Sequence, residues 1–293
     1  MLLDEVLLAY YHQHAKHVRA GTRIKYQLGY IQHFFNGQTV AEACTPDRLQ
    51  QFGQYLLGRE LKPSSANNVL TVLKAALNRA WKRGELDKQI FVPPVKAGHA
   101  DPKGQPLSPA QIAALLNVAA PHMQAMIWLG IGTGARPEAV CELTWDRVDL
   151  EAGRIDLNPA GRAQTSKYRP VVKIAPALRA WLEAQPDKTG HVVKWRGKPV
   201  RRYFTSWENA SRLAGVKATP YSLRHTVARW CRAQGVSVDE IGSLLGHRVP
   251  GGSITERYTS YSPEYQAHAV AAVEKLLQAV ALQLRAAAHK IAA

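Results

Sequence analysis

Apolar residues recur at three- and four-residue spacing near the N-terminus, which is the period of an amphipathic helix. Four segments show this pattern, at residues 3–15, 22–35, 46–57 and 64–83. In the last segment one face carries only apolar side chains, namely Val69, Val72, Leu73, Ala76, Leu77 and Ala80. We expect Ser64 or Ser65 to cap the start of this helix and Gly84 to end it. The pattern predicts an N-terminal bundle of four helices.

The helical period stops at residues 88–106, which contain four prolines and two glycines. This composition is typical of a linker. The helical pattern resumes at Ser108, where Ser-Pro-Ala-Gln predicts a capping box with proline at the first helical position. We therefore expect a helical domain over 1–87, a linker over 88–106 and a larger domain over 107–293.

A nearly continuous apolar stretch opens the larger domain. Residues 122–131 predict a buried helix, which Gly132 and Gly134 end shortly before Arg136. A guanidinium at the start of the next helix, where glycines let a backbone come close, suits phosphate binding.

Strand-like alternation follows over residues 148–157 and 168–174. These segments predict a small antiparallel sheet that carries Lys167 in or near its final turn. Further helices are expected at 176–185, 201–214, 220–234, 237–245 and from 263 towards the C-terminus. The predicted fold class is mainly α with a small antiparallel β-sheet, a helical bundle joined to a larger mixed domain.

The excess of positive charge indicates what kind of partner the chain binds. The chain holds 38 lysines and arginines against 22 aspartates and glutamates, a formal net charge of +16. Residues 1–100 hold 13 basic and 7 acidic side chains, so both parts of the chain are positive. A polyanion that touches both parts is the natural inference, because each neutralised phosphate releases counterions.

An acidic membrane surface would explain the positive charge equally well, but other features argue against it. No run of about 18 apolar residues occurs. The N-terminal sequence MLLDEVLLAYYHQH lacks the basic region and cleavage site of a secretory leader. We expect a soluble cytoplasmic protein with no membrane partner.

The metal-binding residue types do not form a site in the sequence. The cysteines are few, odd in number and far apart, at Cys44, Cys141 and Cys231. The three histidines between residues 12 and 17 lie on an expected exposed helix with no acidic or cysteine partner nearby. We expect neither a disulfide nor a bound metal.

Three residues near the C-terminus have the chemistry that phosphoryl transfer to a tyrosine needs. Arg224, His247 and Tyr258 are separated by 23 and 11 residues. A guanidinium can bind two phosphate oxygens, an imidazole can exchange a proton near neutral pH, and a deprotonated phenol can attack phosphorus. Scattered arginines and histidines on a basic helical domain would be the simpler reading of each residue taken alone.

Longer motifs around these residues are similar to a known family. They are TPYSLRHTVARW at 219–230, IGSLLGHRVPGGSITERYTSYSPEY at 241–265, GTGARPEAVCELTWDRVDL at 132–150 and QTSKYRPVV at 164–172. In this order and over this span they resemble the tyrosine recombinase (phage integrase) family, in its two-domain type. The resemblance matches Arg136 to the family's first catalytic arginine and Lys167 to its lysine.

The resemblance implies a site-specific DNA recombinase or integrase. Tyr258 would attack the scissile phosphate and form a 3′-phosphotyrosine intermediate, which a 5′-hydroxyl later resolves. Arg136 and Arg224 would clamp phosphate oxygens, Lys167 would protonate the leaving oxygen, and His247 would assist near the phenol. One phosphodiester replaces another, so no cofactor and no obligatory metal are implied.

Three departures from the family pattern stand out. Tyr221 replaces the usual histidine three residues before Arg224, and we expect it to donate a hydrogen bond to phosphate. Ala139 replaces the usual acidic residue, with Glu138 one position earlier. His247 and Tyr258 are about two residues further apart than usual. Tyr261 and Tyr265 compete as nucleophiles, but they would lengthen this spacing further.

By resemblance the partners are double-stranded DNA with short inverted-repeat sites and three further copies of the chain, in a homo-tetramer on the bacterial nucleoid. The C-terminal apolar stripe would dock in trans on a neighbour or pack on its own domain; it comprises Val273, Leu276, Leu277, Val280, Leu284 and Ile291. Two alternatives are a type IB topoisomerase that relaxes DNA, and a non-catalytic DNA-binding protein on the same fold.

Overall fold

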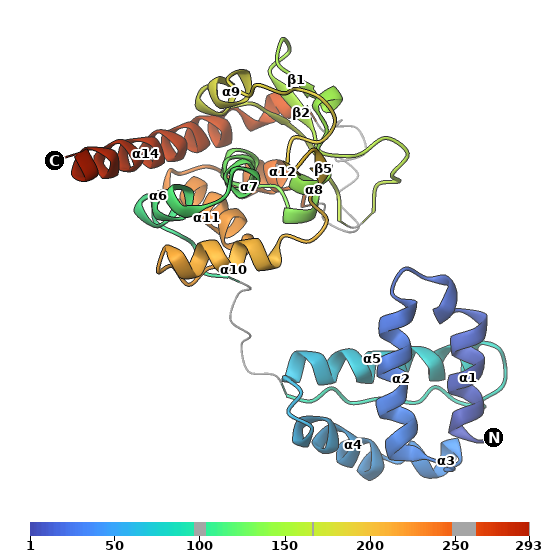
Figure 1. Cartoon of the computed structure of the whole chain (residues 1–293). Helices are drawn as coiled ribbons and strands as arrows, with labels where there is room; N and C mark the ends of the chain where they lie inside the picture. The colour runs from blue at the N-terminus through green and yellow to red at the C-terminus, as the bar shows by residue number, and fades with distance from the viewer. Residues whose placement is uncertain (97–103, 166, 248–261, 293) are drawn as a thin grey trace. The chain divides into compact units, whose positions relative to one another are not determined.

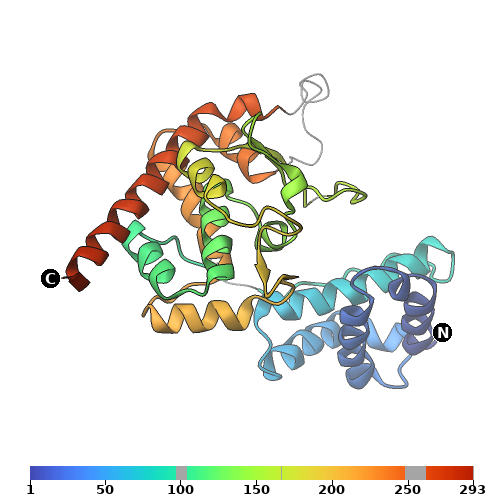
Figure 2. The ribbon, with the colours of Figure 1, turned by 45° about the horizontal axis from the view of Figure 1, so that its top comes forward.

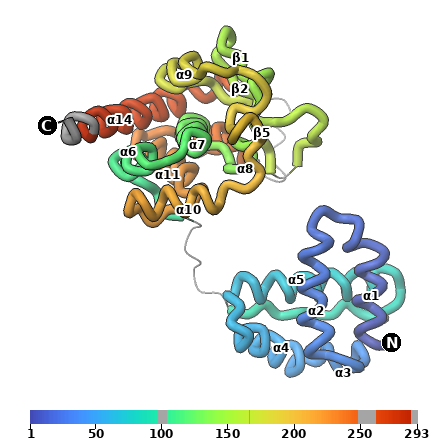
Figure 3. The backbone as a smooth tube through the Cα atoms, viewed as in Figure 1, coloured from blue at the N-terminus to red at the C-terminus, as the bar shows by residue number. Residues whose placement is uncertain are grey.

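Two compact units, Met1–Asp101 and Pro102–Ala293, make up the chain. The computed structural model describes residues 1–96, 104–165, 167–247 and 262–292, and the other residues are grey in Figures 1 and 3. Each unit has its own apolar core, and no buried core residue is shared between the two.

The first unit is the predicted helical bundle. Its elements are α1 (Leu3–Gln13), η1 (Ala15–His17), α2 (Gly21–Phe35), α3 (Val40–Ala43), α4 (Pro46–Gly58) and α5 (Pro63–Lys82). Within this unit α1 and α2 lie beside each other and cross α5 (Figure 3).

The two ends of α5 test the expected caps. The serine caps predicted at the start are wrong, because the helix begins one residue earlier at Pro63 with Lys62 as its N-cap. Proline suits this first position, where its missing N–H would have no helical partner. At the other end Gly84 has a φ of 76° directly after the helix, which confirms it as the terminator.

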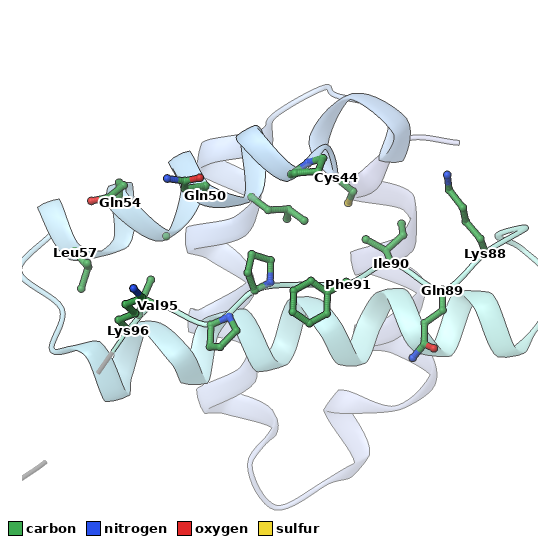
Figure 4. A pocket seen from close by; sticks show the side chains of 15 residues that line it. Cys44, Gln50, Gln54, Leu57, Lys88, Gln89, Ile90, Phe91, Val95 and Lys96 are labelled. Atoms are coloured by element: carbon green, nitrogen blue, oxygen red, sulfur yellow. The ribbon is translucent and has the colours of Figure 1, made fainter. Parts of the chain in front are cut away.

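Residues 88–96, the first half of the expected linker, pack on the first unit. Val92 is buried, and Ile90 and Val95 pack against the same core. The Asn67 side chain donates to the Val95 carbonyl at 3.0 Å and accepts from the Val95 N–H at 2.9 Å. Between this segment and α4 lies a groove of about 790 Å³, with Phe91 74% exposed at its side (Figure 4).

The second unit is mixed, and its first half contains α6 (Pro109–Val118), α7 (Pro121–Thr133), α8 (Pro137–Cys141), η2 (Trp145–Arg147), β1 (Val148–Asp149), β2 (Arg154–Asp156) and β3 (Val171–Lys173). The strands form one antiparallel sheet in the order β1-β2-β3, with Ile155 opposite Val148 and Val172. The predicted capping box is confirmed, since the Ser108 hydroxyl accepts from the Gln111 N–H at 3.2 Å.

The second half of this unit contains α9 (Pro176–Glu183), β4 (Lys194–Trp195), β5 (Lys198–Pro199), α10 (Phe204–Leu213), α11 (Pro220–Ala233), α12 (Val238–Leu245), η3 (Pro263–Gln266) and α14 (Ala267–Ala292). The β4–β5 hairpin was not expected from the sequence. The helices were, so the predicted fold class, mainly α with small antiparallel sheets, is confirmed.

The long helix α14 packs against α6, α7, α9 and α11 of its own unit (Figures 1 and 2). Val273, Leu276, Leu277 and Val280 are at most 1% exposed in the core of that unit. The C-terminal apolar stripe therefore packs in cis over these positions, one of the two alternatives that the sequence left open. No helix among the described residues combines the length and apolar character that crossing a bilayer requires.

Candidate active site

Arg136 is positioned by the sharp end of α7. The chain turns at Gly134, which has a φ of 61° and closes the helix as its C-cap. A Cβ on Gly134 would lie 2.7 Å from Leu245 Cδ2, so glycine is needed both for conformation and for space. Arg136 then serves as the N-cap residue of α8, as expected, and its Nη1 donates to the Tyr168 carbonyl at 2.9 Å.

Arg224 lies on α11 and is only 8% exposed. Its Nη1 donates to the Gly134 carbonyl at 2.9 Å, and its Nη2 donates to the Leu245 carbonyl at 2.8 Å. Burial and the nearby Arg136 lower the pKa of the Arg224 guanidinium to about 10. The group therefore remains a cation at neutral pH, fixed to two helix ends.

His247 follows α12 directly. Its Nε2 lies 2.8 Å from Arg224 Nη2. A guanidinium can only donate, so Nε2 is the acceptor and the ring is neutral, with its proton on Nδ1. Although the residue as a whole is exposed, desolvation of the ring lowers the pKa of His247, and the charges of Arg224 and Arg136 lower it further.

Gly246 lets the end of α12 meet the loop that carries Lys167. Its φ is 65°, and an added Cβ would lie 2.7 Å from both the Tyr168 carbonyl oxygen and Pro170 Cδ. The same Tyr168 carbonyl binds Arg136. The two arginines, His247 and the loop before β3 are thus joined through backbone contacts.

Tyr221 stands one helical turn before Arg224 and is half-buried. Burial raises the pKa of its phenol, as does the Glu138 carboxylate, while Arg136 and Arg224 oppose them. The phenol therefore stays protonated at neutral pH and can donate a hydrogen bond. The charges of both arginines act on its pKa, so Tyr221 lies near the two guanidinium groups.

Two contributors to this pocket, Tyr203 and Arg169, were not predicted from the sequence motifs. The Tyr203 hydroxyl donates to Glu138 Oε1 at 3.2 Å, and the carboxylate of Glu138 partly offsets the pKa decrease that burial causes in Arg136. Arg169 Nη1 pairs with Glu142 Oε2 at 2.7 Å, and its charge lowers the pKa of Arg136. The position of Arg169, two residues after Lys167 in the same motif, was the one feature of the sequence that could have indicated a role in the pocket.

The described parts of the chain show no contact of Lys167 or Tyr258 with the other predicted site residues. Lys167 lies exposed in the loop between β2 and β3, as expected, and no hydrogen bond to its Nζ is found within the described ranges. Tyr258 and its competitor Tyr261 lie outside the described residues. Tyr265, the other competitor, is 62% exposed in η3.

The arrangement gathers positive charge where an anion can bind. Arg136 lies near enough to Arg224 for its charge to lower the pKa of Arg224, and the Glu138 carboxylate raises the pKa of Arg136. Among the described residues no group of three histidine, cysteine, aspartate or glutamate side chains could hold a metal ion. The chemistry available here is electrostatic stabilisation of a phosphate by guanidinium groups.

Sequence comparison places the second unit in a known family. Residues 105–264 match the model of the phage integrase family. The tyrosine recombinase XerA of Thermococcus kodakarensis is 29% identical over 215 residues, 70% of this chain and 74% of that protein. The integrase of Streptomyces ambofaciens is 30% identical over 276 residues, 75% of this chain and 70% of that protein.

The fold is similar to that of a solved integrase. A lambda integrase tetramer bound to a Holliday junction superimposes with a TM-score of 0.67 at 17% identity, covering 85% of this chain and 78% of that one. The family predicted from the four sequence motifs is thereby confirmed. The chain belongs to the phage integrase family and is a tyrosine-type site-specific recombinase.

Proposed function

We propose that this recombinase cleaves and rejoins double-stranded DNA with Tyr258 as nucleophile and the pocket around Arg224 as phosphate site. The observation that carries the proposal is the buried guanidinium of Arg224, held beside Arg136 by Gly134, Leu245 and His247. A guanidinium has five N–H groups, so donors remain for phosphate oxygens after three bonds. An apolar core position would not hold a cation in this way.

In the proposed reaction the Tyr258 phenol releases its proton to solvent as the bond from its oxygen to phosphorus forms and the bond from phosphorus to the 5′-oxygen breaks. Arg136 and Arg224 stabilise the charge that develops on the non-bridging oxygens. Lys167 Nζ gives its proton to the leaving 5′-oxygen. A free 5′-hydroxyl later attacks the phosphotyrosine and gives its proton to Lys167, while Tyr258 leaves and regains a proton from solvent. One phosphodiester bond replaces another, so no hydrolysis is needed.

His247 and Tyr221 take supporting roles in this proposal. The proton on His247 Nδ1 favours a donor role towards a phosphate oxygen, since Nε2 already accepts from Arg224. Tyr221 acts as a second neutral donor, supported by its raised pKa. Neither group is then required to carry charge.

The domain roles follow from charge and packing. Residues 1–87, with 88–96 packed on them, would form the domain that binds DNA at the core site, the rest of 88–106 would connect it, and 107–293 would carry the catalytic pocket. In support, Lys62, Lys74 and Lys82 of the first unit are exposed, and the unit has a complete core of its own. Two positive units on one duplex would hold it as a clamp.

The assembly and target are proposed from the relatives. We expect a homo-tetramer that joins two DNA sites with short inverted repeats, in the cytoplasm of a bacterial cell and on its nucleoid. The lambda integrase tetramer on a Holliday junction supports four copies. The C-terminal stripe would not hold such a tetramer together through Val273, Leu276, Leu277 and Val280, because those side chains are buried in their own unit.

The decisive experiment is capture of the covalent intermediate. A nicked suicide substrate lets the short fragment with the free 5′-hydroxyl diffuse away, so the protein–DNA adduct accumulates and is seen on a denaturing gel. Tyr258→Phe should bind the DNA and give no adduct, because only the attacking oxygen is lost. Tyr265→Phe serves as the matched control and should give the adduct normally. An adduct from Tyr258→Phe, or one mapped to Tyr261 or Tyr265 in the unmodified chain, overturns the assignment.

A further inference from the structure

The loop between β2 and β3 carries Lys167 on an exposed stretch of chain. A general acid must meet the leaving oxygen within hydrogen-bond distance, so the loop's conformation bears on the rate. The strands on either side are three residues each, too short to fix it through backbone pairing alone. Side chains of the loop itself make the remaining bonds.

Gln164 closes the loop across Lys167. Its Nε2 donates to the Arg169 carbonyl at 2.9 Å, and its Oε1 accepts from the Arg169 N–H at 3.1 Å. These two bonds copy the reciprocal pair that opposite residues of an antiparallel ladder exchange. The amide of Gln164 therefore takes the place of a strand partner at the point where the ladder has ended.

Arg162 braces the same loop from inside. Its Nη2 donates to the backbone carbonyl of Lys167 at 3.1 Å, and its Nη1 donates to Asn158 Oδ1 at 2.7 Å. Asn158 Nδ2 returns a bond to the Arg162 carbonyl at 3.0 Å. The Lys167 N–H donates to Thr165 Oγ1 at 3.2 Å. Both backbone groups of Lys167 are thus engaged by side chains that precede it in the loop.

The far side of the loop is attached to the catalytic pocket. The Tyr168 carbonyl accepts from Arg136, and the Arg169 guanidinium, whose side chain is 11% exposed, pairs with Glu142 after α8. The Gln164 side chain hydrogen-bonds to both backbone groups of this same Arg169. The two bonds from Gln164 to Arg169 therefore tie the loop around Lys167 to Arg136, because Arg169 directly follows Tyr168, whose carbonyl binds Arg136.

We propose that Gln164 and Arg162 are positioning residues that hold Lys167 for proton transfer to the leaving 5′-oxygen. This inference rests on the proposed role of Lys167. In the step concerned, the phosphorus–O5′ bond breaks and O5′ takes the proton from Lys167 Nζ. Neither positioning residue gains or loses a proton.

Replacing the leaving 5′-oxygen of the substrate distinguishes an effect of Gln164 on proton transfer from an effect on any other step. In a substrate with sulfur in place of the bridging 5′-oxygen, the departing thiolate is stable without a proton, so a general acid is not needed. Gln164→Leu should cleave the oxygen substrate about tenfold more slowly in a single turnover, the effect of losing its two hydrogen bonds. On the sulfur substrate it should match the unmodified protein.

Controls make each outcome decisive. Lys167→Ala should be slow on oxygen and restored on sulfur; if sulfur fails to restore it, the role of Lys167 itself is wrong. Gln185→Leu loses a comparable amide bond, to the Trp181 carbonyl, away from the loop and should cleave both substrates normally. If Lys167→Ala is restored but Gln164→Leu is slow on both substrates, or normal on both, the positioning inference is overturned. At saturating DNA, Arg162→Ala should also cleave the oxygen substrate slowly and the sulfur substrate at the normal rate. Slow cleavage of the sulfur substrate by Arg162→Ala would remove Arg162 from the proposal.

Discussion

At the scale of single residues, Arg224 shows how this chain keeps a cation in its interior. Desolvation makes a buried charge costly unless hydrogen bonds replace water. Two backbone carbonyls and the neutral ring of His247 supply those bonds. Lysine could not replace it, since an ammonium on a flexible stem cannot reach Gly134, Leu245 and His247 from one planar fork. In the proposed reaction the phosphate would meet a guanidinium that is already in position.

Tyr221 gives the first prediction at this scale. Tyr221→Phe removes one neutral donor from the phosphate pocket and leaves the ring in place. The loss of one donor to a developing charge costs about 10²- to 10³-fold in rate at most, so single-turnover cleavage should slow without being abolished. The covalent adduct should still form through Tyr258. Tyr265→Phe, which removes an exposed phenol from η3, should cleave at the normal rate.

Two results would contradict this role for Tyr221. If Tyr221→Phe formed no adduct while Tyr258 was intact, the phenol would be required for the chemistry itself. If it cleaved at the normal rate, its hydroxyl would make no bond to the substrate. Thermal unfolding of the variant should be measured beside the rates, because Tyr221 is half-buried.

At the scale of elements, α14 is a core helix of its own unit. Leu277 is fully buried against that core, whereas Leu282, five residues later on the same helix, is 65% exposed. Leu277→Ala should lower the free energy of unfolding by 2–5 kcal/mol, roughly the cost of a cavity at a buried leucine. Leu282→Ala should change it by less than about 0.5 kcal/mol.

Denaturant unfolding of the two variants checks this prediction, with the midpoint and slope compared at equal protein concentration. Equal stability of Leu277→Ala and the unmodified chain would mean that α14 does not pack in cis in solution. The apolar stripe would then be free to dock on a neighbouring copy, the alternative that the sequence also allowed.

The sequence predicts elements well where the signal is local. Ser108 and Gln111 lie three residues apart, and Gly134 needs no partner to end a helix, so both were found from short motifs. The β4–β5 hairpin was missed because each strand has two residues, too few for a visible alternation. Its turn at Arg196 and Gly197 has positive φ at both positions, and an arginine in the sequence does not predict a positive φ.

Contacts between distant residues explain the other differences. Residues 88–96 look like linker in composition, but buried Val92 and two hydrogen bonds to Asn67, 28 residues before Val95, hold them on the bundle. In the site, the motifs identified Arg136 and Arg224, but the bond from Tyr203 to Glu138 spans 65 residues. Local patterns carry no information on such pairs, which depend on how α8 and α10 are packed.

At the scale of the whole molecule, the positive charge is distributed over two units that fold around separate cores. Each unit can therefore contribute its own phosphate contacts to one DNA site. Counterion release then makes the affinity of the whole chain depend on salt more steeply than that of either unit. The first unit is the place to measure this, because it lies outside the residues matched by the family model.

Lys74 and Lys82 provide the last prediction. Both are exposed on α5 and eight residues apart, a spacing that keeps them on one side of the helix. If each contacts a phosphate, the slope of log affinity against log salt should fall in magnitude by about 1.8 when both are changed to glutamate, since each contact contributes about 0.9. The matched control changes Lys16 and Arg59, also exposed in the first unit but outside α5, to glutamate. Fluorescence anisotropy with a duplex core site over a salt series gives both slopes, and equal slopes for the two double variants would show that α5 does not face the DNA.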